Sequence, residues 1–231
     1  MIVGFGGALS AGKDTAGKRF ANMIDMPSVQ ISFAAKLKAS VAALLDVDVN
    51  EFDRWKNDPE VKLFLSDGEY VAYEDDENHL VGPLVIREFT FRTVLQRYGT
   101  ESHREIFGSD FWVDQALSPA DDPTILYYVT DVRFDNEVEG VKQRGGPVIQ
   151  ILTGDEPEIA EAVRQDPEGV ETVFYYDLKT GDPIHPSEVP PVGFTHTIMN
   201  DVRDDNFRNL DNQLSALVME LGLPLKSLVT L

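Results

Sequence analysis

The sequence predicts an α/β fold, in which a doubly wound, mostly parallel sheet carries helices on both faces and an inserted lid region. Two observations predict this fold class. The chain opens with a strand–turn–helix–strand–helix pattern over residues 2–45, and a strand–helix–strand unit follows over residues 124–152. Short apolar strands that alternate with amphipathic helices are typical of a parallel sheet with crossover helices. With 231 residues, the chain has the length of one domain with insertions or of a compact pair.

The first elements are predicted from local patterns. Residues 2–6 are an apolar run that ends in glycines, which is typical of a buried strand entering a tight turn. Apolar residues recur at helical spacing from Gly12 to about Met23 and over residues 34–45, so both segments are predicted to be helices. A second buried strand is predicted between them, over residues 29–33.

The second half of the chain contains the most convincing buried strand, residues 124–130, which ends in Asp131. The other regular elements predicted beyond residue 86 are a helix over 87–98 with further helical turns to 117, a helix over 137–144, strands over 147–152 and 197–199, and a helix over 206–221.

Two acidic stretches interrupt this pattern. Residues 66–83 are turn-rich and lack helical periodicity, so a surface hairpin or flexible excursion is expected there. Residues 154–191 are rich in proline and acids, with a strand-like segment at 172–178. Too few apolar residues remain in this stretch to close an independent core, so we interpret it as an inserted subdomain or mobile lid. The prediction is a single domain over residues 1–231, with an acidic excursion at about 66–83 and a lid-like insert at about 154–195.

Composition excludes several classes of function. The 40 acidic and 20 basic side chains give a net charge of −20, which argues against a nucleic acid or an anionic membrane surface as partner. Because the chain has no cysteine, disulfides, cysteine-ligated zinc, iron–sulfur clusters and thiol nucleophiles are excluded. Neither a signal peptide nor an apolar run of about 20 residues is found. A soluble, cytoplasmic protein is therefore expected. A few basic residues that converge in one cleft would still suit a small phosphorylated substrate.

The strongest motif is the glycine-rich loop, which we define as residues 7–13. Its sequence Gly7-Ala-Leu-Ser-Ala-Gly12-Lys13 matches G-x-x-x-x-G-K and stands between a predicted strand and a predicted helix. In such a loop, backbone N–H groups point at phosphate oxygens, and the lysine reaches the β- and γ-phosphates. A plain glycine-rich turn with an exposed lysine is the weaker alternative. The residues predicted to bind ATP are Gly7, Ala11, Gly12, Lys13, Asp14 and Thr15.

Three residues are predicted to serve a Mg²⁺ ion. The Ser or Thr that usually follows the lysine is replaced by Asp14, and Thr15 comes one residue later. Thr15 would supply a hydroxyl, or Asp14 would hold the metal through water, and the sequence leaves both open. Asp131 stands at the carboxyl end of the most apolar strand, where ligands bind in open parallel sheets. It would hold hydrated Mg²⁺. The alternative for Asp131 is a strand-end cap.

Arginines gather in one part of this acidic chain. Arg87, Arg92, Arg97 and Arg104 crowd the stretch that also contains Trp112, and Arg133 follows Asp131 by two residues. For any single arginine, an ion pair at the surface is the more common role. For the group, an anionic ligand is favoured, because the planar guanidinium suits bidentate phosphate recognition.

Four segments together carry a family resemblance. They are the glycine-rich loop with its continuation GKDT, FAAKLK at residues 33–38, LQRYGTESHREIFGSDFWV at residues 95–113, and VTDVRFDNEVEGVKQRGG at residues 129–146. The chain resembles the phage-type deoxynucleoside monophosphate kinases. This resemblance implies a P-loop kinase fold that transfers the γ-phosphoryl group of ATP to a deoxynucleoside monophosphate (dNMP) with Mg²⁺, for DNA precursor synthesis. If the protein is phage-encoded, it would act in the host cytoplasm.

The resemblance also implies roles for individual residues. Lys13 would belong to the donor site, and Arg104, Arg133 and Asp131 would join it as catalytic residues. The residues expected to bind the dNMP are Lys38, Arg92, Tyr98, Arg104, Trp112 and Arg133. Trp112 would lie near the base or sugar. Apart from the resemblance, Tyr98 and Trp112 are the bulky side chains beside the arginines that are available to exclude a 2′-hydroxyl. The chain departs from the family in residues 154–196, whose basic residues do not align with the family's lid.

Other functions remain as alternatives. Dephospho-CoA kinase and phosphomevalonate kinase share the loop and a set of phosphate-binding arginines. A P-loop ATPase module would need a base that positions water, for which Glu137 is available, and a basic partner surface, which the charge distribution lacks. A homodimer is left open.

Overall fold

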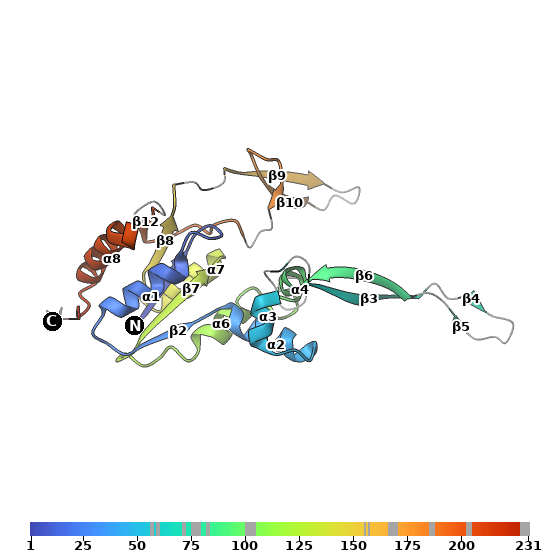
Figure 1. Ribbon diagram of the computed structural model, residues 1–231, viewed down its shortest axis with the longest axis horizontal. Coiled ribbons are helices and arrows are strands. Elements are labelled where there is room, and N and C mark those ends of the chain that lie inside the picture. Colours follow the sequence, from blue (N-terminus) through green and yellow to red (C-terminus); the bar gives the residue numbers. More distant parts are fainter. Residues whose placement is uncertain are drawn as a thin grey trace. The chain divides into compact units, whose positions relative to one another are not determined.

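The computed structural model describes residues 1–55, 58, 61–70, 73–74, 80–81, 84–99, 105–154, 156, 158–165, 171–184, 188–201 and 205–226 (Figure 1). These residues divide into two compact units. The first unit consists of residues 1–35 and 109–231, and the second of residues 36–108. The expected α/β fold is present in the first unit as a parallel sheet with helices.

A five-stranded parallel sheet forms the centre of the first unit, with the strand order β12-β8-β1-β7-β2. The strands are β1 (Ile2–Gly6), β2 (Ser28–Ile31), β7 (Leu126–Val132), β8 (Val148–Leu152) and β12 (His196–Met199). The chain first builds β2 and β7 on one side of β1, and then β8 and β12 on the other side. Ligands of open α/β sheets bind at the carboxyl ends of the strands, where the order reverses in this way. Here that position is the end of β1.

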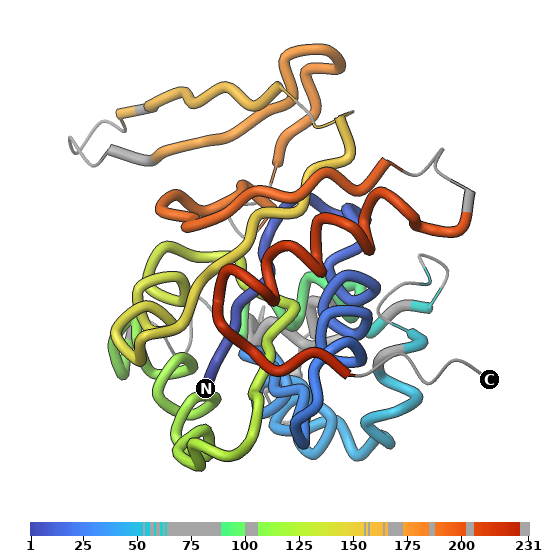
Figure 2. Tube along the Cα trace, turned by 90° about the vertical axis from the view of Figure 1, so that its left-hand side faces the viewer, coloured from blue at the N-terminus to red at the C-terminus, as the bar shows by residue number. Residues whose placement is uncertain are grey.

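Helices cover both faces of this sheet. On one face, α1 (Lys13–Met23) packs beside α8 (Arg208–Glu220), as the blue and red helices in Figure 2 show. On the other face, α6 (Phe111–Leu117) packs against α7 (Asp135–Gln143). Each face has its own buried cluster: Val3 and Phe5 of β1 belong to the first, and Ile2 to the second. The alternation of side chains along β1 thus supplies both cores.

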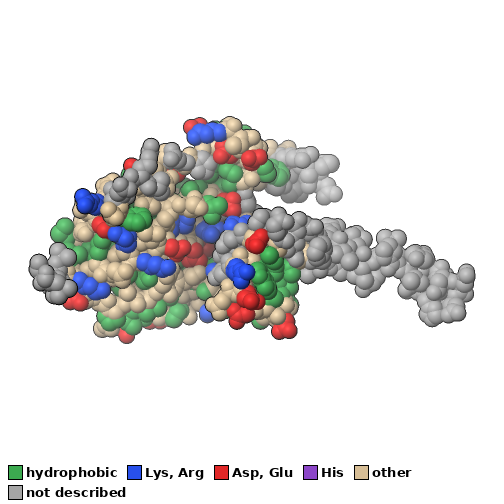
Figure 3. Space-filling model, in the orientation of Figure 1, with side chains coloured by type: hydrophobic (Ala, Val, Ile, Leu, Met, Phe, Trp, Pro, Cys, Tyr) green, Lys and Arg blue, Asp and Glu red, His purple; other side chains and the backbone are tan. Residues whose placement is uncertain are grey.

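The predicted insert contains a small antiparallel sheet of β9 (Ile159–Gln165), β10 (Glu171–Asp177) and β11 (Pro183–Ile184), in the order β11-β10-β9. The expected strand at residues 172–178 is therefore confirmed as β10. Apolar side chains are exposed on this sheet, as Figure 3 shows in green; Val163 is 55% exposed and Phe174 46%.

The second unit has a separate apolar cluster, centred on Val41, Phe52 and Phe91, with the last two rings 5.1 Å apart. Its elements are α2 (Ala34–Leu44), which begins at the end of the first unit, α3 (Val49–Trp55), β3 (Lys62–Tyr70), β4 (Tyr73–Glu74), β5 (Leu80–Val81), β6 (Leu84–Thr90), α4 (Phe91–Arg97) and α5 (Glu105–Phe107). No helix among the described residues of either unit is both long and apolar enough to cross a membrane.

Two element predictions were wrong in part. The strand predicted as buried over residues 29–33 is β2, an edge strand whose first three residues are exposed. The helix predicted from residue 87 begins only at Phe91, because residues 84–90 form β6 and pair with β3. Thr90 caps α4, since its Oγ1 accepts a hydrogen bond of 3.1 Å from the N–H of Thr93. Of the expected acidic excursion, residues 71–72, 75–79 and 82–83 lie outside the described residues.

Candidate functional site

The glycine-rich loop follows β1 directly and ends at Lys13, the first residue of α1. Two of its glycines have positive φ angles, 139° at Gly7 and 86° at Gly12. A Cβ atom at Gly7 would lie 2.4 Å from the carbonyl oxygen of Ile151, and one at Gly12 would lie 2.3 Å from Nδ2 of Asn200. Glycine is therefore favoured at both positions by its positive φ, and a side chain would also meet the backbone of β8 at Gly7 and the Asn200 side chain at Gly12.

Asn200 holds the glycine-rich loop through a side-chain hydrogen bond. It follows β12 directly, is only 3% exposed, and its Nδ2 donates a hydrogen bond of 2.9 Å to the carbonyl oxygen of Ala11. Its backbone N–H donates to Leu152 at 2.7 Å, which fixes the residue to β8. Asn200 is not among the site residues predicted from the sequence. Its signal was a polar side chain directly after the last predicted strand, at the edge of the sheet where ligands bind.

The side chain of Lys13 folds back over the glycine-rich loop. Its Nζ donates hydrogen bonds to the carbonyl oxygens of Gly7, at 3.0 Å, and Ala8, at 2.6 Å. The ammonium group therefore lies beside the loop whose helix-terminal N–H groups attract anions.

Burial and neighbouring charges lower the pKa of the Lys13 ammonium group. Its pKa falls from 10.5 to about 8, mainly because burial disfavours the ammonium form, and secondly because the Arg133 guanidinium repels it. Asp14 and Asp131 raise the pKa, but by less. Two cations close enough to repel each other favour the binding of an anion between or beside them. The predicted site residues that act on one another here are Lys13, Asp14, Asp131 and Arg133.

A small pocket of about 20 Å³ adjoins these cations. It is lined by Leu9 and Lys13 from the glycine-rich loop, by Arg133 after β7, and by residues 188–191, of which Glu188 is acidic. This volume admits about one water molecule. The pocket therefore brings two cations and one carboxylate to the carboxyl end of β1. Glu188 was also missed, because acidic residues are common throughout the predicted insert.

Asp131 binds the beginning of α2 through both of its oxygens. It accepts hydrogen bonds from the Ser32 hydroxyl at 2.7 Å, from the N–H of Phe33 at 3.1 Å and from the N–H of Ala34 at 3.0 Å. These contacts match the strand-end and helix-capping alternative. A carboxylate in this position also adds negative potential near Lys13. The metal role of Asp131 stays a prediction.

Asp14 is held at one oxygen by two side chains. Its Oδ1 accepts hydrogen bonds from the buried hydroxyl of Thr130 and, at 3.3 Å, from Nε2 of Gln30. The same Gln30 nitrogen donates to the Thr130 hydroxyl at 2.9 Å. Asp14 is thereby oriented from β2 and β7, while Thr15 follows it in the first turn of α1.

The oxygen donors near the loop fit a Mg²⁺ ion that is held chiefly by a phosphate ligand. Carboxylates and hydroxyls are the hard ligands that Mg²⁺ prefers, and one or two carboxylates suffice when phosphates and water complete the octahedron. The described part of the chain contains no group of three or more acidic or histidine side chains able to hold a metal by themselves. Asp14, Thr15 and Asp131 stay the predicted residues to hold such an ion beside a phosphate.

Glu137 fixes the backbone that carries Arg133. It is only 3% exposed, and its Oε2 accepts hydrogen bonds from the N–H of Arg133 at 2.6 Å and of Phe134 at 3.1 Å. A buried carboxylate with these partners is suited to hold the start of α7. It is not placed as an exposed base that positions water.

The acceptor-side residues are distributed over the chain. Lys38, Arg92 and Tyr98 belong to the second unit, where Tyr98 packs against the apolar cluster. Arg104 lies outside the described residues. Trp112 is in α6, 5% exposed, with its ring 4.8 Å from that of Phe111 in an edge-to-face arrangement. The roles of these residues in binding a dNMP stay predictions.

Neither the protein-family models nor the curated protein sequences compared with the chain include a match. The function is therefore inferred from the residues of this site and from the sequence motifs.

Proposed function

We propose that this protein is a P-loop kinase that transfers the γ-phosphoryl group of ATP to a deoxynucleoside monophosphate. One observation carries the proposal: the glycine-rich loop ends β1 at the point where the strand order reverses, and Lys13 and Arg133 line one pocket beside it. A loop of glycines, a helix N-terminus and two converging cations suit the phosphates of a nucleoside triphosphate.

On the donor side, the backbone N–H groups of the loop would hold the phosphates, and Lys13 would leave its carbonyl partners to contact the β- and γ-phosphates. Bound Mg²⁺ would neutralise charge on the phosphate oxygens, with Asp14, Thr15 and Asp131 as the predicted ligands. Arg133 would place its guanidinium at the transferring group, because Glu137 fixes its backbone.

On the acceptor side, a phosphate oxygen of the dNMP is already a competent nucleophile, so no protein base is required. It attacks the γ-phosphorus, the bond to the bridging oxygen breaks, and ADP leaves. In-line placement of the two phosphates is the main task, and it is assigned to Lys38, Arg92 and Arg104 by the family resemblance. Cytoplasmic location and a role in DNA precursor synthesis belong to the same proposal.

A P-loop ATPase module is less well supported. Its water-positioning base would be Glu137, whose buried carboxylate accepts hydrogen bonds from two backbone N–H groups. A different small-molecule kinase of this class, such as a dephospho-CoA kinase or phosphomevalonate kinase, would use the same donor site and differ only in its acceptor.

A substrate panel tests the proposal. The purified full-length protein is incubated with ATP and Mg²⁺ and each dNMP and NMP in turn, and the release of ADP is measured with and without the acceptor. ADP release that requires a dNMP supports the proposal. Release that is equal without any acceptor indicates an ATPase, and release that requires only an unrelated phosphorylated acceptor indicates another kinase.

A further inference from the structure

We propose that Glu188 makes nucleotide binding at this site depend on a divalent cation. The inference rests on the proposed function and adds a residue that neither the motif nor the family resemblance assigns. Glu188 lines the pocket that also contains Lys13 and Arg133.

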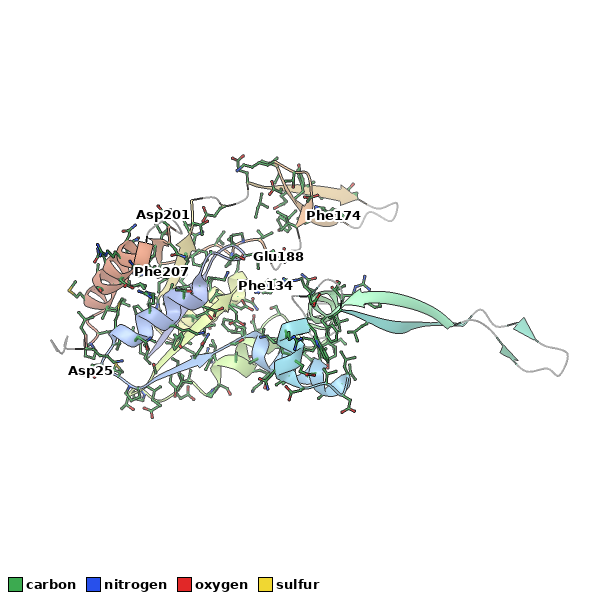
Figure 4. All side chains as sticks on the ribbon, in the orientation of Figure 1. Asp25, Phe134, Phe174, Glu188, Asp201 and Phe207 are labelled. Carbon is green, nitrogen blue, oxygen red and sulfur yellow. The ribbon has the colours of Figure 1, made fainter. Side chains whose placement is uncertain are left out.

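Glu188 belongs to a segment that is attached to the parallel sheet. We call residues 188–195 the return segment, because it leads from β11 back to β12; Figure 4 labels Glu188 on it. The N–H of Val192 donates to Oδ1 of Asp135 at 2.8 Å, at the start of α7. Thr195 binds Val148 of β8 through its N–H, at 2.8 Å, and through its hydroxyl, at 3.0 Å.

Packing adds to these hydrogen bonds. The ring of Phe194 fills the space where a side chain on Gly6 would lie, since a Cβ atom there would be 2.6 Å from the ring. Pro191 is buried. Residues 191–195 of the predicted lid-like insert are therefore anchored to the unit that contains the glycine-rich loop, and Glu188 stands three residues before them.

The charges that line the pocket affect which form of a phosphate ligand binds beside it. A polyphosphate without metal that approaches Lys13 and Arg133 also approaches the carboxylate of Glu188, and two like charges at close range repel. A divalent cation held between the carboxylate and the phosphate turns this repulsion into attraction. Mg²⁺ commonly uses one carboxylate together with substrate phosphates in this way.

The two other acids near the loop bind groups of the protein itself. Both oxygens of Asp131 accept hydrogen bonds from the beginning of α2, and Oδ1 of Asp14 accepts two. Glu188 belongs to the return segment, which lines the pocket together with the glycine-rich loop and Arg133. Glu188 is thus an acidic residue that lines the same pocket as both cations.

Titration calorimetry with a non-hydrolysable ATP analogue tests the inference, because it measures binding and does not depend on turnover. The dissociation constant is determined with excess Mg²⁺ and with EDTA, for the natural protein and for Glu188→Gln. We define the ratio as the dissociation constant in EDTA divided by that in excess Mg²⁺. We expect this ratio to fall by at least about tenfold in Glu188→Gln. The ratio would fall because the variant binds the ATP analogue more tightly in EDTA and less tightly in Mg²⁺. Glu188→Asp should keep most of the ratio.

Controls separate this result from its alternatives. Glu161→Gln removes an exposed charge of the same kind on β9 and should leave the ratio unchanged. If Glu188→Gln strengthens binding by the same factor with and without Mg²⁺, Glu188 only competes with phosphate and the inference is wrong. An unchanged ratio also overturns it, while nucleotide binding by the natural protein keeps the proposed function intact. A natural protein that binds no nucleotide under either condition overturns both.

Discussion

The side-chain amide of Asn200 occupies the space in which residue 12 would carry a Cβ atom, 2.3 Å from where that atom would lie. Gly12 and Asn200 are 188 residues apart in the sequence, yet the end of the last parallel strand fixes the conformation of the glycine-rich loop. The hydrogen bond from Asn200 to Ala11 completes this contact.

Gly12→Ala should therefore damage the loop in two ways. Alanine at a φ of 86° costs about 1–2 kcal/mol, and its methyl group must also displace Asn200. We expect a larger loss of unfolding free energy than this strain alone, and at least about tenfold weaker ATP binding. Chemical denaturation and calorimetry measure the two effects.

Gly145→Ala is the matched control for strain, because Gly145 has a φ of 73° and open space where its Cβ would lie. Equal losses of stability in the two variants would show that Asn200 does not restrict residue 12. In Gly12→Ala with Asn200→Ala, we expect less than the sum of the two single effects, because the clash is removed.

The pH dependence of nucleotide binding should report the protonation of the Lys13 side chain. Its pKa in the free protein is about 8, and a bound phosphate would raise it, because a nearby anion favours the charged form. Affinity is therefore fully developed below pH 8 and falls as the pH rises through 8 toward the higher pKa of the complex. The slope approaches about tenfold per pH unit there.

Lys13→Arg supplies the comparison for this titration, since arginine stays charged over the whole range. Its affinity for the ATP analogue should vary little between about pH 7 and about pH 9.5. A natural protein whose affinity does not change across the same range would contradict an ammonium–phosphate contact at Lys13. Lys18→Ala, an exposed position on the same helix, should leave the titration unchanged.

Much of the sheet could be predicted because each of its strands has a local signature. The apolar run of β1 and the strand at residues 124–130 needed no tertiary information. The strand β6 could not be predicted, because it depends on pairing with β3, about 20 residues earlier, and its sequence also fits a helix. The exposure of β2 follows from its place at the edge of the sheet, which local periodicity does not specify.

The residues of the candidate site also divide into those that local sequence patterns predict and those that depend on tertiary contacts. Lys13, Asp14 and Asp131 could be found because motif spacing and strand ends identify them. Asn200 binds Ala11, and Glu188 lines a pocket with Lys13. These segments are far apart in the chain, so no local sequence pattern predicts that they meet. Glu137 was noticed for its chemistry, but only its burial and backbone partners show what it contacts.

Glu137→Gln should mainly affect the structure around Arg133. The amide keeps one acceptor oxygen but loses the charge, and a weakened buried hydrogen bond costs about 1–3 kcal/mol. We expect lower thermal stability and a reduced kcat, with no selective effect on ATP hydrolysis in the absence of an acceptor. A variant of unchanged stability that loses only such hydrolysis would instead identify Glu137 as a base of an ATPase.

Arg92→Ala and Arg104→Ala should separate the acceptor side from the donor side. If these arginines hold the phosphate of the dNMP in line, their loss raises the KM for the dNMP and lowers kcat, because both binding and orientation suffer. Affinity for ATP should stay within about twofold of the natural value, since in the proposed function the glycine-rich loop and Lys13 would hold the donor phosphates. Steady-state kinetics with varied dNMP, and calorimetry with the ATP analogue alone, measure the two sides independently. An equal loss of ATP affinity would place these arginines at the donor phosphates, and the assignment of Lys38 beside them would then have to be revised.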